Sequence, residues 1–193
     1  MTTNIAFIIG NGPSRQPIKL NDLSEAGKTF GCNALYRDFP ALDYLIAIDP
    51  GMSEEISQIS DCASEVIIPP YDEQFEMAEY NPLARRRSNA GMNAMIEAVR
   101  RDHNILYCLG FDFILKGSAS VDNIYKGTPN YGAETKSVES DNYYRVKYFE
   151  WLTNKFHETK FVMVIPDGME TKPIYSSNVS GMSLSVFIAN LYD

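Results

Sequence analysis

Short apolar runs alternate with helix-like patterns along most of this chain, and this alternation constrains the fold more than any other feature of the sequence. The runs are rich in Ile, Val, Phe and Tyr and lie at residues 5–9, 29–33, 44–48, 65–68, 105–109 and 161–165. Several are apolar on both faces, as parallel strands covered by helices on both sides must be. The sequence therefore predicts an α/β fold of Rossmann-like type, a doubly wound and mostly parallel sheet with helices on both faces.

Three helices are predicted where apolar residues recur at i, i+3, i+4 and i+7. They cover residues 92–99 behind an N-cap at Asn89, residues 146–156 from a start near Ser140 or Asp141, and residues 184–191 capped by Ser180 or Ser183. Two stretches, 69–86 and 115–138, break the alternation. A long loop in a compact domain is usually a lid or a binding loop, or else disordered, and we predict that 115–138 is a lid over a binding site.

Chain length and charge limit the number of domains and the kinds of partner. The chain has 193 residues, 45% of them hydrophobic, which fits a single globular domain over 1–193. It carries 17 Lys and Arg against 25 Asp and Glu, a net charge of −8 at pH 7. Such an acidic surface repels nucleic acids and anionic membranes, so neither is expected as a partner. Any phosphate that the protein binds must be met by local positive groups.

The sequence predicts a cytoplasmic protein without a metal site. It has no run of about 18 apolar residues that could form a transmembrane helix, and its first residues lack the basic region of a signal peptide. Cys32, Cys62 and Cys108 form no Cys-x-x-Cys motif and are expected to be reduced structural thiols. His103 and His157 have no His or Cys partner at ligand spacing.

The residues after the predicted strands are the candidate site, because ligands of such sheets bind beyond the carboxyl ends of the strands. The first strand runs into Gly10-Asn11-Gly12-Pro13-Ser14, where two glycines allow a tight turn that exposes backbone N–H groups to a phosphate. The third glycine of the dinucleotide fingerprint is missing, since Arg15 stands at its position. The alternative is an ordinary turn between a strand and a helix.

Polar side chains also lie at the ends of the next two strands. Asn33 is the last residue of the second predicted strand, and Asp49 directly follows the third. An amide can donate to a phosphate or ribose and accept from a base, and a carboxylate can bind a ribose hydroxyl or a metal ion. Asp49 could instead form an Asx turn before Pro50.

A basic cluster and a further strand end complete the predicted site. Arg85, Arg86 and Arg87 precede Ser88-Asn89-Ala90-Gly91 at a predicted helix start, which is a suitable anion site unless the charges are simply solvated. The fifth strand ends at Gly110, and Asp112 follows it, as a ligand contact or as a buried structural acceptor.

Together these segments resemble, in order and spacing, the bacterial sialyltransferases of glycosyltransferase family forty-two. The resemblance is carried by Gly10-Asn11-Gly12-Pro13-Ser14, Cys32-Asn33, Arg87 with Gly91 four residues later, and Gly110-Phe111-Asp112-Phe113, and it spans most of the chain. The first motif is also similar to the opening of 6-hydroxymethylpterin diphosphokinase-like proteins. By itself it therefore indicates nucleotide binding and not one reaction.

The resemblance implies a glycosyltransferase-type fold and a site for a cytidine monophosphate sugar donor, with no metal or other cofactor required. It assigns donor contacts to Asn11, Ser14, Asn33, Arg87, Asn89, Ala90 and Gly91. With the other strand-end residues and two tyrosines of the predicted lid, the predicted substrate site is Gly10, Asn11, Gly12, Ser14, Asn33, Asp49, Arg87, Asn89, Ala90, Gly91, Gly110, Asp112, Tyr125 and Tyr131.

The chain departs from the family pattern at the catalytic groups. The family has a histidine just before the helix that is predicted here to start near residue 140, whereas this sequence has none there. Glu139 or Asp141 is therefore the predicted general base. The phosphate-contacting tyrosines of the family fall on Ile114 and Ser120, so we expect Tyr125 or Tyr131 to serve instead.

The sequence as a whole predicts a glycosyltransferase-like protein that binds a nucleotide-activated sugar, of CMP-sialic acid type, and transfers the sugar to the hydroxyl of a small or glycan acceptor. One alternative is diphosphate transfer with Asp49 and Asp112 holding magnesium, as in the pterin diphosphokinase-like proteins. The other is a nucleotide-binding module without catalysis.

Overall fold

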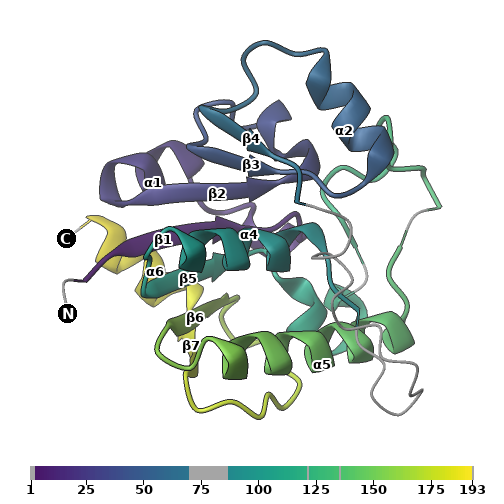
Figure 1. The fold of residues 1–193 in the computed structure, drawn as a ribbon. Coiled ribbons are helices and arrows are strands. Elements are labelled where there is room, and N and C mark those ends of the chain that lie inside the picture. Colours follow the sequence, from purple (N-terminus) through teal and green to yellow (C-terminus); the bar gives the residue numbers. More distant parts are fainter. Residues whose placement is uncertain (1–2, 70–86, 121, 135, 193) are drawn as a thin grey trace.

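A seven-stranded parallel sheet forms the centre of the molecule (Figure 1). The computed structural model describes residues 3–69, 87–120, 122–134 and 136–192. The strand order is β4-β3-β2-β1-β5-β6-β7, and every neighbouring pair is parallel. The strands are β1 (Ile5–Ile9), β2 (Lys28–Cys32), β3 (Tyr44–Ile46), β4 (Glu65–Ile67), β5 (Ile105–Leu109), β6 (Lys160–Ile165) and β7 (Val179–Ser183). The predicted doubly wound parallel sheet is confirmed.

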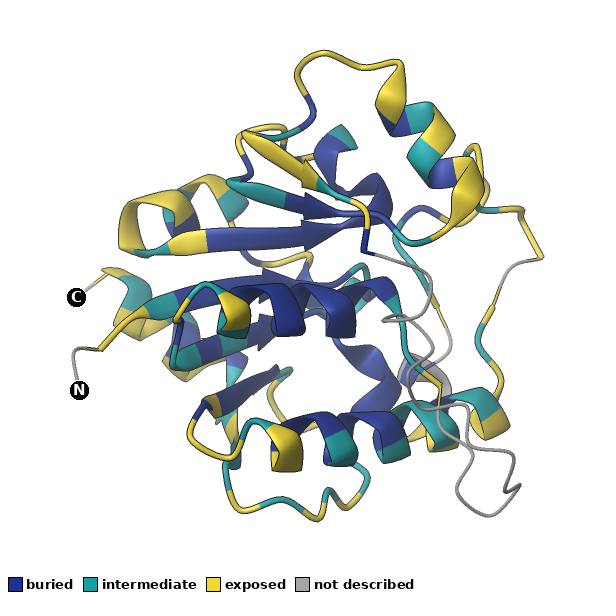
Figure 2. Cartoon of the chain, viewed as in Figure 1, coloured by how far each residue is buried: buried dark blue, intermediate teal, exposed yellow. Residues whose placement is uncertain are grey.

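Helices cover both faces of the sheet. The α-helices of the described residues are α1 (Leu20–Ala26), α2 (Pro50–Ser57), α4 (Ala90–Arg100), α5 (Glu139–Lys155) and α6 (Leu184–Tyr192). On β1, Ala6 and Ile8 pack into the core under α4 and α5, whereas Phe7 and Ile9 pack into the core on the opposite face with α6. Figure 2 shows the buried central strands between these layers. β1, which is apolar on both faces, is therefore buried between two helical layers, as the sequence predicts.

The chain reverses its winding direction at β1. From β1 it passes outward through β2, β3 and β4, and then returns to β5 on the other side of β1. The carboxyl ends of β1 and β5 thus form the switch point at which open α/β sheets bind ligands. Among the residues that the structure describes, four short 3-10 helices lie near this edge: η1 (Pro13–Arg15), η2 (Asn33–Arg37), η4 (Asp112–Ile114) and η5 (Gly117–Ser120).

Element boundaries differ slightly from the predicted ones. β2 ends at Cys32 because Asn33 turns into the left-handed region, with φ 50°, and opens η2. The Asn89 cap is confirmed, since its Oδ1 accepts a hydrogen bond of 2.9 Å from the Met92 N–H at the start of α4. The predicted loop at 69–86 lies outside the described residues except for Pro69.

The C-terminal region corrects one prediction. Ser180 is no helix cap, because it lies inside β7, the outermost strand beside β6. α6 begins only at Leu184, and its first turn is met by Asp167, which accepts hydrogen bonds from the N–H (3.2 Å) and hydroxyl (2.8 Å) of Ser185. An edge strand that is partly exposed needs few apolar residues, so its sequence signal is weak. No helix in the described part of the chain is both long and apolar enough to cross a membrane.

The turns after β1 and β5 touch backbone to backbone. Gly10 N–H donates to the Leu109 carbonyl (2.7 Å) and Gly12 N–H to the Gly110 carbonyl (3.0 Å). A Cβ on Gly10 would lie 2.6 Å from the Gly110 oxygen, and one on Gly110 would lie 2.8 Å from the Gly10 oxygen. Gly110 also has φ +70°, which L side chains rarely adopt. Glycine is therefore required at both positions.

We expect Gly110→Ala to lower the free energy of unfolding by ~3 kcal/mol or more, because strain at positive φ adds to a steric clash. The matched control is Gly168→Ala, at φ +77° with no atom within 4 Å of the added Cβ. It should cost only the strain of ~1–2 kcal/mol. Urea denaturation measures both values, and equal losses would contradict the clash.

Candidate functional site

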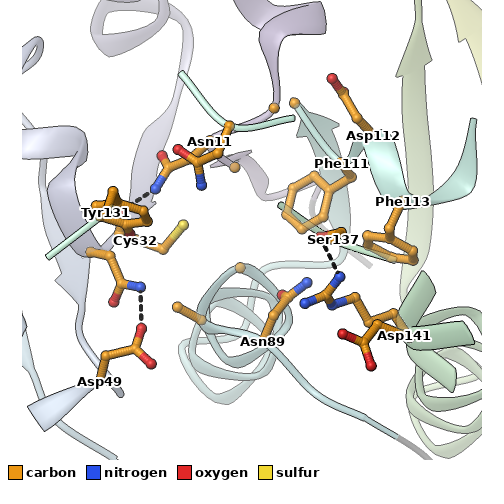
Figure 3. Close-up of a pocket in the computed structure, with 18 of the residues that line it drawn as sticks. Asn11, Cys32, Asp49, Asn89, Phe111, Asp112, Phe113, Tyr131, Ser137 and Asp141 are labelled. Atoms are coloured by element: carbon orange, nitrogen blue, oxygen red, sulfur yellow. Dashed lines mark hydrogen bonds between the residues drawn. The ribbon is translucent and has the colours of Figure 1, made fainter. Parts of the chain in front are cut away.

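A cavity of about 570 Å³ opens at the carboxyl ends of β1, β2 and β5, beside the first turns of α4 and α5 (Figure 3). Most of the predicted site residues line it together. They are Gly10, Asn11, Gly12, Asn33, Asp49, Arg87, Asn89, Ala90, Gly91, Gly110, Asp112, Tyr131 and Asp141. Ser14, Tyr125 and Glu139 do not line it. Arg85 and Arg86 lie outside the described residues.

Two asparagine amides lie side by side in the cavity wall. Asn11 Nδ2 donates to the carbonyl of Cys32 (3.1 Å), and Asn33 Nδ2 donates to Asp49 Oδ2 (2.6 Å). The Oδ1 atoms of both amides are buried and accept no hydrogen bond within the described part of the chain. Because an unsatisfied buried acceptor is costly, these oxygens are positioned for donors that a ligand would bring.

Tyr131 places a hydroxyl beside the same amides. Burial raises the pKa of Tyr131 to about 12, and the neighbouring Asn33 and Asn11 amides act in the opposite direction. The phenol therefore stays protonated at neutral pH and can donate a hydrogen bond.

The segment that carries Tyr131 is tied to the rest of the fold. The Tyr125 hydroxyl donates a hydrogen bond to Asp38 (2.7 Å) and accepts one from buried Arg15 (2.9 Å). These bonds attach the segment to the rest of the fold. Arg37 donates to Thr128 (2.7 Å). Asn130 Nδ2 donates to Glu55 on α2 (2.6 Å). Residues of the predicted lid between 122 and 131 thus line the cavity and are hydrogen-bonded to the rest of the fold.

Asp112 joins the two turns at the switch point. Its Oδ2 accepts the Ser14 N–H (3.0 Å) and its Oδ1 accepts the Ser14 hydroxyl. Burial raises the pKa of Asp112, while Ser14 and nearby Arg15 oppose the shift. A Cβ on Gly12 would lie 2.4 Å from the Asp112 carboxyl carbon, so that glycine makes room for the carboxylate. Ser14 and Asp112 act together as a structural tie, and Ser14 itself does not reach the cavity.

The N-terminus of α4 faces the cavity with Asn89, Ala90 and Gly91. A Cβ on Gly91 would lie 2.7 Å from the ring of Phe111, so glycine lets the helix start pack closely against this aromatic residue. The free N–H groups and dipole of such an 11-residue helix favour a bound anion. Arg87 adds a positive charge two residues before the cap.

The two predicted bases, Glu139 and Asp141, have different surroundings at the start of α5. Asp141 lines the cavity and forms an ion pair with Arg87, with 2.5 Å between Oδ1 and Nη1. Glu139 pairs instead with Lys172 (3.2 Å) and accepts from the Ser120 hydroxyl (3.2 Å). Residues two apart on a helix point in nearly opposite directions, so only Asp141 is placed to act on a ligand in the cavity.

Sequence reasoning missed several lining residues, among them Phe113, Asn130, Ser137, Asn142 and Arg145. Arg145 had a usable signal, because it stands four residues after Asp141 and so shares its helix face. Ser137 and Asn130 carried none, since they come from a segment without regular pattern.

The structure also bears on the predictions about the cysteines and about a metal site. Cys32, Cys62 and Cys108 are free and buried, and burial raises the pKa of the Cys32 thiol to about 12, which suits structural thiols. Asp49 and Asp112 both line the cavity, but within the described ranges no group of three or more His, Cys, Asp or Glu side chains could hold a metal ion.

Comparisons with known proteins show the fold. No protein-family model matches the chain, and no curated protein matches its sequence. The structure is similar to that of the sialyltransferase CstII from Campylobacter jejuni in complex with the substrate analogue CMP-3FNeuAc, with 13% identity, a TM-score of 0.51, and coverage of 83% of this chain and 81% of that one. A second CstII structure, with cytidine-5'-monophosphate, has 14% identity, a TM-score of 0.49 and coverage of 83% and 79%. At such low identity the first likeness supports a Rossmann-like, glycosyltransferase-type fold.

The raised pKa of Asp112 makes a prediction about stability. A carboxyl whose pKa in the folded state lies above its ordinary value of 3.8 stabilises the fold when protonated, and this contribution is lost as pH rises through the folded value. Asp112→Asn keeps the shape without the ionisation. We expect the stability of the wild type relative to this variant to fall as pH rises from about 3 to 6. Parallel urea titrations at each pH test this, and a rise instead would show that the Ser14 bonds outweigh burial.

Proposed function

We propose that this protein is a sialyltransferase-like glycosyltransferase that binds a nucleotide-activated sugar in the cavity and transfers the sugar to an acceptor hydroxyl. The observation that carries the proposal is the pair of buried, unsatisfied Asn11 and Asn33 oxygens beside the N-terminus of α4, at the switch point of the sheet. Hydrogen-bond acceptors for a nucleoside and an anion site for its phosphate thus meet in one cavity.

The nucleoside would bind on the Asn11 and Asn33 side. Their Oδ1 atoms can accept from an amino group of the base or from a ribose hydroxyl. Asp49, also at this side, is a further acceptor for a ribose hydroxyl, and Tyr131 is a donor. CMP sugars are the first donors to test, because the similar CstII structure holds a CMP-linked substrate analogue.

The phosphate and sugar would then lie toward α4 and α5. In the transfer, the acceptor oxygen attacks the anomeric carbon, the bond from that carbon to the phosphate oxygen breaks, and the nucleotide leaves with the bonding electrons. Asp141 is the candidate general base that takes the acceptor proton, since it lines the cavity and Glu139 does not. Asp141 must first leave its ion pair with Arg87.

We expect CMP or a CMP sugar to bind the wild type in the presence of a chelator, because the α4 N-terminus and Arg87 supply the positive charge. Asn11→Ala should weaken binding by about 1–3 kcal/mol. Asn154→Ala is the matched control, an exposed asparagine on α5 that does not line the cavity. Calorimetry with and without magnesium measures both effects.

Two results of that titration would count against the proposal. Absence of nucleotide binding at millimolar concentration would remove its premise. Strict dependence on magnesium would favour the diphosphate-transfer alternative, in which Asp49 and Asp112 hold the ion.

The base assignment predicts different effects for two neighbouring carboxylates. Asp141→Asn should slow transfer, or hydrolysis of the donor, by about 10²–10⁴-fold, which is the usual contribution of a general base. Glu139→Gln should leave the rate within a few-fold of the wild type, because Glu139 does not line the cavity and its carboxylate is paired with Lys172. Rates of CMP release, with donor binding measured separately, decide between them. Equal rates in both variants would reject Asp141, and no turnover with any bound donor would favour the binding-module alternative.

A further inference from the structure

Arg145 brings a second guanidinium to the corner of the cavity where Arg87 meets α5. It stands on α5 one turn after Asp141, is partly buried, and lines the cavity with both of them. The backbone also fixes this corner, because Arg87 N–H donates to the carbonyl of Tyr144 on α5 (3.1 Å). Figure 3 shows Ser137, Asp141 and Asn89 around the same space.

One edge of the Arg145 guanidinium has no protein partner within the described part of the chain. Nη1 makes both of its hydrogen bonds there, to Ser137 Oγ (2.7 Å) and Asn142 Oδ1 (2.8 Å). Nε is buried and has no hydrogen-bond partner. The bonds at Nη1 fix the orientation of the group and leave the edge formed by Nε and Nη2, which matches two oxygens of an oxyanion. Because a buried donor without a hydrogen-bond partner is costly, an acceptor atom of a ligand would satisfy Nε.

Arg87 and Arg145 bring two positive charges to this corner, and Asp141 brings one negative charge. Burial and the nearby Arg87 lower the pKa of Arg145, and Asp141 opposes them, but a guanidinium remains charged at neutral pH. Two positive groups therefore share the single carboxylate of Asp141. The Arg87–Asp141 pair is partly exposed, and such ion pairs stabilise weakly, so a stronger anion can replace the carboxylate.

We propose that Arg145, together with Arg87, is an additional catalytic residue that binds the phosphate of the leaving nucleotide and displaces Asp141 from Arg87. The proposal rests on the proposed function and adds to it the group that accepts the leaving charge.

The charge change during transfer explains why two arginines suit this step. A phosphate that links a nucleoside to a sugar carries one negative charge. Once the bond to the anomeric carbon breaks, the bonding electrons remain on the phosphate oxygen, and the free monophosphate approaches two negative charges at neutral pH. Two guanidiniums therefore bind the product-like phosphate better than the intact donor, which is the difference that accelerates a reaction. The same exchange frees Asp141 to take the acceptor proton.

Inorganic phosphate, CMP and cytidine are the probes of this inference, titrated into the wild type and variants by calorimetry at low ionic strength. Arg145→Gln should weaken phosphate and CMP binding by about tenfold or more, as expected when charge-assisted hydrogen bonds are lost, and should leave cytidine within about twofold. Lys155→Gln removes a positive charge from the same helix at a position that does not line the cavity, and should leave all three affinities unchanged within about twofold.

Two further readouts separate anion binding from a structural role. Wild-type affinity for phosphate should rise between about pH 6 and pH 8 as the dianion forms, and this rise should be smaller in Arg145→Gln. Asp141→Asn should tighten phosphate binding several-fold, because it removes the competing carboxylate. If Arg145→Gln does not fold, Arg145→Lys replaces it, with a several-fold loss expected because a point charge cannot reproduce the two-pronged contact.

The inference is overturned if inorganic phosphate does not bind, if Arg145→Gln and Lys155→Gln weaken it equally, or if Asp141→Asn weakens it. The proposed function fails separately, since its own premise is binding of the nucleoside by the asparagine amides. Phosphate binding without measurable affinity for cytidine or CMP would uphold the anion site and reject the nucleotide site.

Discussion

The close approach of two backbone turns, at Gly10 after β1 and Gly110 after β5, sets the position of everything else at the functional edge. No side chain fits between these turns, so the sheet ends in bare peptide groups at its switch point. The Ser14–Asp112 tie then fixes η1 against η4, and both turns become parts of one rigid surface. The asparagine amides and the α4 N-terminus are arranged around this surface, which sets the positions of the nucleotide and phosphate sides of the proposed site.

The central fold could be predicted from the sequence because its physical cause is local. A strand such as β1, apolar on both faces, can only be buried between two helical layers. The elements that were not predicted are α1, α2 and β7, which are short or lie toward the surface, with few buried positions. Ser180 shows the result most clearly, since a half-exposed edge strand containing serine and glycine resembles the approach to a helix.

The residues of the candidate site also fall into a predictable and an unpredictable group. Residues directly after strands were predictable, because parallel strands bring their carboxyl ends to one edge whatever the rest of the chain does. Side chains whose position depends on distant partners were not. Tyr125 contacts Arg15 and Asp38, which lie 110 and 87 positions away in the sequence. The separate directions of Glu139 and Asp141 depended on knowing where α5 begins. The orientation of the Arg145 guanidinium likewise depends on its hydrogen bond to Ser137. No sequence pattern predicts the position of Ser137.

The positive corner at Arg87 and Arg145 sits in a protein of net charge −8, and this contrast affects how fast an anion arrives as well as how tightly it is held. At a distance, a nucleotide experiences the repulsive field of the whole acidic surface, whereas the two arginines attract it mainly at short range. The Debye length is about 10 Å at 0.1 M salt, so added salt screens the long-range repulsion before it weakens the contact itself. Association should therefore speed up with salt while dissociation also speeds up, the reverse of the steering found in enzymes whose surface attracts their substrate.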